Sequence, residues 1–232
     1  MAKSTVAIIT DSASDIPPDA AKRLGITIVP VIVSFGSESF KVNEELSMDQ
    51  FWKRLTAPGA PFPKTAAPPP AAFTAAYDKA FAGGAKEIVS VHVASKLSAT
   101  YRNAEIAAAD HPQSKNIHLV DTATASAAEG LLVARAYHRA EEGWKAPQIV
   151  AELGELIPKT HVIFFLDSLD YLKAGGRITA TSSRTWLRSG MKSCAGSCSA
   201  CSRMSNRANS SWRSVCRPLW KFLAAIILSY RS

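Results

Sequence analysis

The chain has 232 residues, of which 47% are hydrophobic, and this apolar content excludes a disordered polypeptide. It contains no run of 18 or more apolar residues. The longest candidate, residues 219–230, is short and is interrupted by Lys221, so we expect no transmembrane segment. The first residues lack the apolar core of a signal peptide, which makes a cytoplasmic protein the expectation.

The formal net charge of +8 is unevenly distributed along the chain. Residues 1–178 contain 18 basic and 19 acidic side chains, whereas residues 179–232 contain 9 basic side chains and no acidic one. All four cysteines lie in residues 179–232, so no disulfide framework is expected in the first part. The first part is therefore a nearly neutral globular sequence, and the basic charge belongs to the last 54 residues.

The first elements predicted are a strand and a helix. Residues 6–11 form a short apolar run that ends in polar residues, the pattern of a buried parallel strand. Residues 17–24 predict a helix with proline in its first turn and Gly25 just beyond its end. Residues 26–35 predict a second strand, in which Pro30 indicates an edge strand or a bend.

A second helix begins at Ser47, which forms a capping box with Gln50. We expect this helix to direct Phe51, Trp52 and Leu55 inward. Six prolines in residues 58–70 then prevent helix formation until about Pro70. The remaining predicted elements are helices over residues 70–81, 98–109, 125–142 and 148–156 and strands over residues 87–93, 116–121 and 161–167. Because strands and helices alternate, we predict an α/β fold, a parallel sheet with helices on both faces.

Polar residues follow three of these strands, at residues 10–15, 95–100 and 121–124. The carboxyl ends of parallel strands share one edge of the sheet, where ligands of such folds bind. Hydroxyl groups predominate in all three segments, and together with helix N-termini they suit an anionic head group such as a carboxylate or a phosphate. The alternative is that Ser14, Asp15 and Ser98 are ordinary helix N-caps.

Four motifs in the order found here resemble those of DegV proteins. They are residues 10–17, the Pro63-Lys64-Thr65 segment, residues 95–101, and residues 167–172 followed by 175–178. The resemblance covers residues 5–178. It implies an EDD-type fold in which residues 1–160 form the N-terminal α/β domain and residues 161–178 begin a second domain, which is truncated or aberrant here.

The resemblance also implies a function. Bacterial DegV proteins bind a long-chain fatty acid and present its carboxylate to a fatty-acid kinase subunit, without being enzymes and without a cofactor. Thr65 and Ser98 would bind the fatty-acid carboxylate, and Ser95 and Arg177 are further candidates for ligand or partner contact.

The sequence departs from the family pattern at several positions. Residues 66–67 are Ala-Ala where the family has Ser-Gln, which removes possible donors beside Thr65, and Ala99 replaces a glycine. No histidine follows His161, so the histidine that reaches the carboxylate in family members has no counterpart. A rival function is an enzyme that acts on a small phosphorylated or carboxylated metabolite and uses Asp11 or Asp121 as acid or base.

Residues 179–232 match nothing in the family pattern, and we interpret them as a possible frameshift product. Three alternatives remain open. Cys194, Cys198 and Cys201 have a spacing known from iron–sulfur sites, and with Cys216 they could hold zinc. The arginines and tryptophans could bind nucleic acid, although no nucleic-acid partner is expected.

Overall fold

The computed structural model describes residues 4–162 and 174–176. The chain divides into two units near residue 164, and the named helices and strands lie before that point. The predicted strand over residues 161–167 and the site candidate Arg177 lie outside the described residues, apart from the first two positions of that strand.

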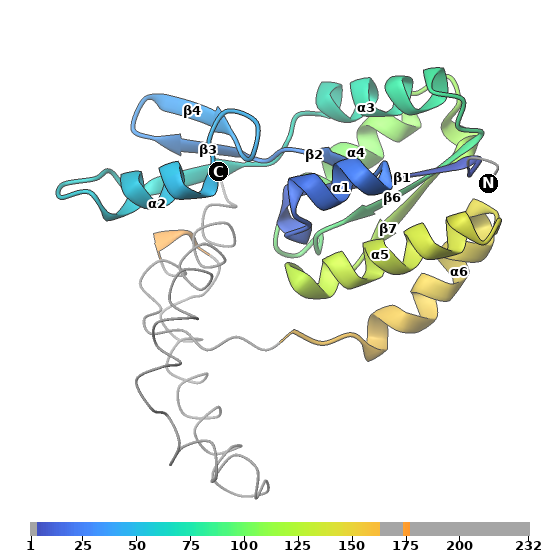
Figure 1. The fold of residues 1–232 in the computed structure, drawn as a ribbon. Coiled ribbons are helices and arrows are strands. Elements are labelled where there is room, and N and C mark those ends of the chain that lie inside the picture. Colours follow the sequence, from blue (N-terminus) through green and yellow to red (C-terminus); the bar gives the residue numbers. More distant parts are fainter. Residues whose placement is uncertain (1–3, 163–173, 177–232) are drawn as a thin grey trace, which may run out of the picture. The chain divides into compact units, whose positions relative to one another are not determined.

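A four-stranded sheet forms the centre of the first unit, with the order β2-β1-β6-β7 (Figure 1). All neighbouring strands are parallel. The strands are β1 (Val6–Asp11), β2 (Thr27–Val29), β6 (Glu87–His92) and β7 (Ile117–Asp121). The predicted α/β class with a parallel sheet is therefore confirmed.

Helices cover both faces of this sheet, as predicted. The helices on one face are α1 (Pro18–Leu24), α5 (Ala127–Glu141) and α6 (Ala146–Leu156). Those on the other face are α3 (Pro70–Ala82) and α4 (Thr100–Ala109). Short 3-10 helices, η1 (Ser12–Ser14), η2 (Ser114–Asn116) and η3 (Ile157–Lys159), complete the helical elements.

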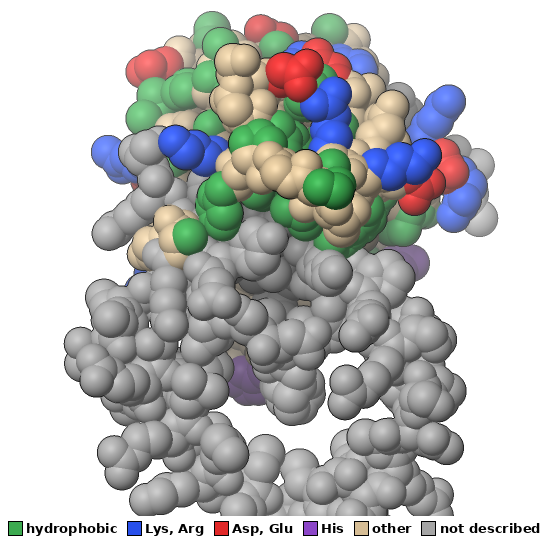
Figure 2. Space-filling view, turned by 90° about the vertical axis from the view of Figure 1, so that its left-hand side faces the viewer, with side chains coloured by type: hydrophobic (Ala, Val, Ile, Leu, Met, Phe, Trp, Pro, Cys, Tyr) green, Lys and Arg blue, Asp and Glu red, His purple; other side chains and the backbone are tan. Residues whose placement is uncertain are grey.

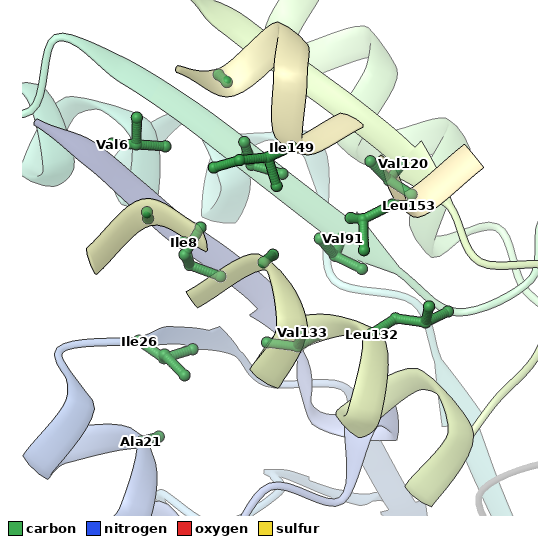
Figure 3. Close-up of a cluster of buried hydrophobic side chains, with 14 residues drawn as sticks. Val6, Ile8, Ala21, Ile26, Val91, Val120, Leu132, Val133, Ile149 and Leu153 are labelled. Carbon is green, nitrogen blue, oxygen red and sulfur yellow. The ribbon is translucent and has the colours of Figure 1, made fainter. Parts of the chain in front are cut away.

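Alternating side chains of each strand produce these two buried layers. Val89 and Val91 of β6 belong to one buried cluster with Leu132 of α5 and Leu153 of α6, and Figure 3 labels Val91, Leu132 and Leu153 within it. Ile88 of the same strand belongs to the opposite cluster. Since each fully buried aliphatic side chain stabilises the fold by about 1.5–3 kcal/mol, both layers contribute to the stability of the sheet.

A second, antiparallel sheet has the order β4-β3-β5. Its strands are β3 (Ile32–Phe35), β4 (Glu38–Lys41) and β5 (Pro63–Ala66), accompanied by α2 (Met48–Thr56). The rings of Phe35 and Phe51 pack with centroids 5.7 Å apart, which joins α2 to this sheet. Figure 2 views the molecule from the side on which this sheet and α2 lie, and acidic and basic side chains are interspersed there with hydrophobic ones.

The small sheet corrects two predictions. The single strand expected over residues 26–35 is two strands in different sheets, because Pro30 cannot donate to a ladder and the chain leaves the parallel sheet there. The proline-rich segment contains the unpredicted strand β5, which is possible because β5 is an edge strand with Pro63 at its first position. Strand β4 was also not predicted.

Local helix signals predicted some features correctly and others only in part. The capping box of Ser47 and Gln50 is confirmed, and Gly25 adopts the left-handed conformation (φ 70°) that ends α1. Phe51 is buried as predicted, whereas Trp52 and Leu55 are half-buried. In the described part of the chain, no helix has both the length and the apolarity that crossing a bilayer would require.

Candidate functional site

The carboxyl ends of β1, β6 and β7 lie side by side because the register pairs Thr10 with Val91 and His92 with Asp121. The polar segments predicted to form the site therefore meet at one edge of the parallel sheet, as the alternation of strands and helices implied. Three residues near this edge, Asp15, Ala123 and Ser126, have positive φ values of 53°, 53° and 62°. Such strained backbone is concentrated at functional sites in proteins.

The Asp11 side chain connects the loops that follow β1 and β6 at this edge of the sheet. It is fully buried. Its Oδ1 accepts a hydrogen bond from the Ala13 amide (2.9 Å), and its Oδ2 accepts one from the Val93 amide (3.1 Å). Both oxygens are thus used to fix the segments that follow β1 and β6.

A buried histidine extends this connection, and sequence reasoning missed it. His92 Nδ1 lies 3.1 Å from Asp11 Oδ2, and His92 Nε2 lies 2.7 Å from Ser90 Oγ. Nδ1 is placed to donate to the Asp11 carboxylate, and Nε2 of a neutral ring would then accept from the Ser90 hydroxyl. Ser90 Oγ also lies 3.3 Å from the Tyr77 hydroxyl, and burial raises the pKa of Tyr77 to about 12.

The order serine, histidine, aspartate has the connectivity of a nucleophilic triad, but Ser90, His92 and Asp11 are all fully buried. A nucleophile must reach its substrate, so this network is structural. It joins α3 to the ends of β6 and β1. The signal that could have revealed it is the period of two in β6, which places Ser90 and His92 on one face.

A second buried group, Glu129 of α5, lies on the opposite face of the sheet. It is fully buried, and its Oε1 accepts a hydrogen bond from Thr10 Oγ1 (3.4 Å), whereas Oε2 has no partner among the described residues. Burial, followed by the nearby charges of Asp11 and Asp15, holds the pKa of Glu129 well above its usual value. The folded chain therefore favours the protonated form of Glu129 more than the unfolded chain does.

Ser98, the first predicted carboxylate ligand, is buried just before α4. Its Oγ accepts a hydrogen bond from the Thr100 amide (3.0 Å) and lies 2.6 Å from Thr100 Oγ1. The helix begins at Thr100 rather than at Ser98 as predicted. The alternative interpretation of Ser98 as an ordinary N-cap is wrong, because the N-cap of α4 is Ala99, which makes no side-chain cap; the Ser98 hydroxyl instead accepts from the amide of the first helical residue.

Thr65, the second predicted ligand, lies in β5 opposite Val33. It is 8% exposed, and its Oγ1 has no hydrogen-bond partner within the described part of the chain. Thr124 Oγ1, in the segment after β7, is likewise buried without such a partner. A buried hydroxyl without a partner costs about 1–3 kcal/mol, so these positions favour the arrival of a further polar group.

The remaining predicted residues have peripheral or structural positions. Ser95 is exposed, and its amide donates to Asp121 Oδ1 (3.2 Å), which also accepts from the Ala123 amide (3.0 Å). Asp121 therefore ties the loop after β6 to the loop after β7. Within the described residues, no group of three or more His, Cys, Asp or Glu side chains is placed to hold a metal ion.

Comparisons with known proteins show the family to which the chain is similar. The family model described as "DegV family" matches residues 5–184. A DegV domain-containing protein of Deinococcus radiodurans is 36% identical over 178 residues, which cover 77% of this chain and 62% of that protein. The chain thus spans less than two thirds of the length of this relative.

Solved structures show the same fold. A fatty-acid-binding DegV family protein from Thermus thermophilus is 34% identical, with a TM-score of 0.67 over 77% of this chain and 62% of its own. A stearic-acid-binding protein from Eubacterium ventriosum is 26% identical, with a TM-score of 0.68 over 77% of this chain and 63% of its own. The fold of the described residues is therefore that of proteins that bind fatty acids.

Proposed function

Because this chain belongs to the DegV family, we propose that it binds a long-chain fatty acid and presents the carboxylate to a separate fatty-acid kinase subunit. In this proposal the chain carries the lipid and performs no catalysis of its own. The acyl chain supplies most of the affinity, at about 0.8 kcal/mol for each buried methylene. The polar groups at the site determine which end of the lipid is presented.

The observation that carries the proposal is the buried hydroxyl of Thr65, which has no hydrogen-bond partner among residues 4–162 and 174–176. A hydroxyl can donate to a carboxylate, and a buried carboxylate requires such donors because an unpaired charge in an apolar site is very costly. Ser98 is the second donor. Its Oγ already accepts from the Thr100 amide, so its own proton can be directed to the ligand when Thr100 Oγ1 donates to it.

The rival function, an enzyme that uses Asp11 or Asp121, gains no support from the geometry. Asp11 is fully buried and both of its oxygens are engaged by backbone amides. Asp121 Oδ1 accepts from two amides and orders two loops. The contacts found for both carboxylates among the described residues therefore connect loops of the fold.

The first test replaces Thr65 with valine, which has the same shape but lacks the hydroxyl. Because that hydroxyl has no partner in the described part of the protein, we expect Thr65→Val to leave the unfolding free energy unchanged or higher. Fatty-acid occupancy, measured by native mass spectrometry on the purified full chain, should fall. Unchanged occupancy in Thr65→Val would contradict the assignment of this residue.

Thr122→Val is the matched control, since Thr122 is also buried but its Oγ1 donates to the His92 carbonyl (2.8 Å). We expect this control to lose about 1–3 kcal/mol of unfolding free energy.

Ser98→Ala should reduce fatty-acid occupancy. It should also lower the unfolding free energy by about 1 kcal/mol, because it removes the acceptor for the Thr100 amide.

The second test concerns the kinase. Acyl phosphate should form only when ATP, a fatty-acid kinase subunit, this chain and the fatty acid are all present. Ser95, exposed at the edge of the site, and Arg177 are the proposed partner contacts. Replacing either with alanine should lower the rate of acyl phosphate formation while fatty-acid occupancy is retained.

A further inference from the structure

The two proposed carboxylate ligands belong to different sheets. Thr65 lies in β5 of the antiparallel sheet, whereas Ser98 lies in the loop that leaves β6 of the parallel sheet. One carboxylate can accept from both hydroxyls only if the two sheets are held at a fixed separation. A site of this kind tolerates displacements of only about 0.5 Å.

One polar contact joins the two ligand-bearing segments directly. Asn103 Nδ2 donates a 2.8 Å hydrogen bond to the carbonyl oxygen of Pro68. Asn103 lies in α4, which begins just after Ser98, and Pro68 follows Thr65 by three residues. Pro68 is buried and stands first in a run of three prolines with restricted φ, so its carbonyl is a stiff point of attachment.

A second contact also joins the two sheets. Ser12 Oγ accepts a 3.0 Å hydrogen bond from the amide of Val31, and both residues are buried. Val31 is the residue before β3, whose Val33 pairs with Thr65. The Val31 carbonyl also accepts from the Val42 amide (3.0 Å), so the start of the small sheet is fixed at both backbone groups.

Ser12 is in turn connected to the segment that carries Ser98. It follows Asp11, whose Oδ2 accepts from the Val93 amide at the beginning of that segment. Ser12 and Asn103 therefore connect the surroundings of Thr65 to those of Ser98 by two separate routes.

We propose that Ser12 and Asn103 are positioning residues that set the separation of the Thr65 and Ser98 hydroxyls and so give the site its preference for a carboxylate. This inference rests on the proposed function. Neither residue needs to contact the ligand. Removing the Ser12 hydroxyl leaves the Val31 amide without this partner, and removing the Asn103 side chain does the same to the Pro68 carbonyl. The small sheet can then shift relative to Ser98. The apolar contacts of the acyl chain do not depend on this alignment.

The experiment compares stearate with octadecanol, which has the same chain length but no carboxylate. Dissociation constants for both are measured on the delipidated full chain, for wild type, Ser12→Ala and Asn103→Ala. We expect the preference for stearate to fall about tenfold in each variant while octadecanol affinity stays within about twofold. A purely structural role would weaken both ligands equally, because it would only reduce the folded fraction.

Ser34→Ala is the control, since Ser34 Oγ bonds Ser39 Oγ (2.8 Å) within the same small sheet but on its exposed side. It should keep the wild-type preference. In a Thr65→Val background, Asn103→Ala should reduce the preference no further, because Asn103 acts through the placement of Thr65.

The possible failures are distinguishable. If the wild type prefers stearate and both variants keep this preference, the positioning role alone is overturned. The positioning role is also overturned if the Thr65 and Asn103 substitutions reduce the preference for stearate additively in the double variant. A wild-type chain that binds neither ligand contradicts the proposed function, and the positioning role is overturned with it.

Discussion

Glu129 is the residue whose ionisation most directly concerns the stability of this fold. It is fully buried, accepts a hydrogen bond from Thr10 and lies near Asp11 and Asp15. Burial is the largest reason that its pKa is raised well above 4.5, and the two neighbouring carboxylates add to the effect. The folded chain therefore holds a proton on Glu129 more tightly than the unfolded chain does.

The raised pKa of Glu129 predicts that the unfolding free energy decreases as the pH rises. The stability associated with the Glu129 proton is fully present below the unfolded pKa, near 4.5, and is lost as the pH rises through the higher folded pKa. Between those two values the unfolding free energy should fall by up to about 1.4 kcal/mol for each pH unit. Glu129→Gln, which is neutral at every pH, should not show this loss.

The measurement is urea unfolding of wild type and Glu129→Gln from pH 5 to pH 9. The difference in unfolding free energy, variant minus wild type, should grow with pH. Glu141→Gln is the control, because Glu141 is an exposed residue of the same helix. A difference for Glu129→Gln that stays flat across this range would show that the buried carboxyl is not held protonated.

At the level of residues, the sequence predicted two candidate hydroxyls, Thr65 and Ser98, but not the buried polar groups His92 and Glu129. Thr65 and Ser98 follow from motif positions, and both are buried in the structure. His92 and Glu129 were missed because their roles depend on partners far along the chain: His92 contacts Asp11 across 81 positions, and Thr10 bonds Glu129 across 119. Nothing local in the sequence marks a charged residue of a helix as fully enclosed.

At the level of elements, a close approach joins α5 to the 3-10 helix after β1. A Cβ atom placed on Gly130 of α5 would lie 2.5 Å from the carbonyl oxygen of Ser14. Both partners are backbone, so neither can move without displacing η1 or α5. Glycine at this position allows α5 to pack against the loop that carries Ser12.

We therefore expect Gly130→Ala to destabilise the fold by about 1–3 kcal/mol, the usual cost of inserting a methyl group into a packed site. Gly154→Ala provides the matched control, because Gly154 lies within α6 and a Cβ atom placed on it would meet nothing within 4 Å. That control should stabilise the chain by about 0.5–1 kcal/mol, since alanine favours helix. Urea unfolding gives the change in unfolding free energy for each variant. Equal changes in Gly130→Ala and Gly154→Ala would show that the contact with Ser14 is unimportant.

Elements with strong local signals were predictable, and those that depend on pairing were not. The helices and the parallel strands follow from hydrophobic period, caps and glycine stops. Strands β4 and β5 carry little apolar signal of their own: β4 is mostly exposed, and β5 lies in a proline-rich segment. Each exists because β3 lies between them and pairs with both. The sheet that holds Thr65 therefore could not be predicted from local sequence.

At the level of the whole molecule, charge and family resemblance change at nearly the same place. The family model ends at residue 184, shortly after the last predicted motif at residue 178. From residue 179 onward the chain has 9 basic side chains, 13 serines and no acidic side chain. A folded α/β domain normally mixes charges of both signs, as residues 1–178 do.

We propose that the coding sequence changes reading frame close to residue 178, beyond which the chain has no acidic side chain. The encoding DNA can test this. Translation of one of the other two frames beyond that point should continue the DegV pattern, with a lysine-proline-containing strand and a histidine that could reach the carboxylate. Such a histidine would supply a third donor beside Thr65 and Ser98. Restoring that frame should then raise fatty-acid affinity, because the acyl chain would be covered by a second apolar surface.

If neither alternative frame encodes a DegV pattern, residues 179–232 are the protein's own sequence. Deleting them should then abolish any steeply salt-dependent nucleic-acid binding that the 9 basic residues confer.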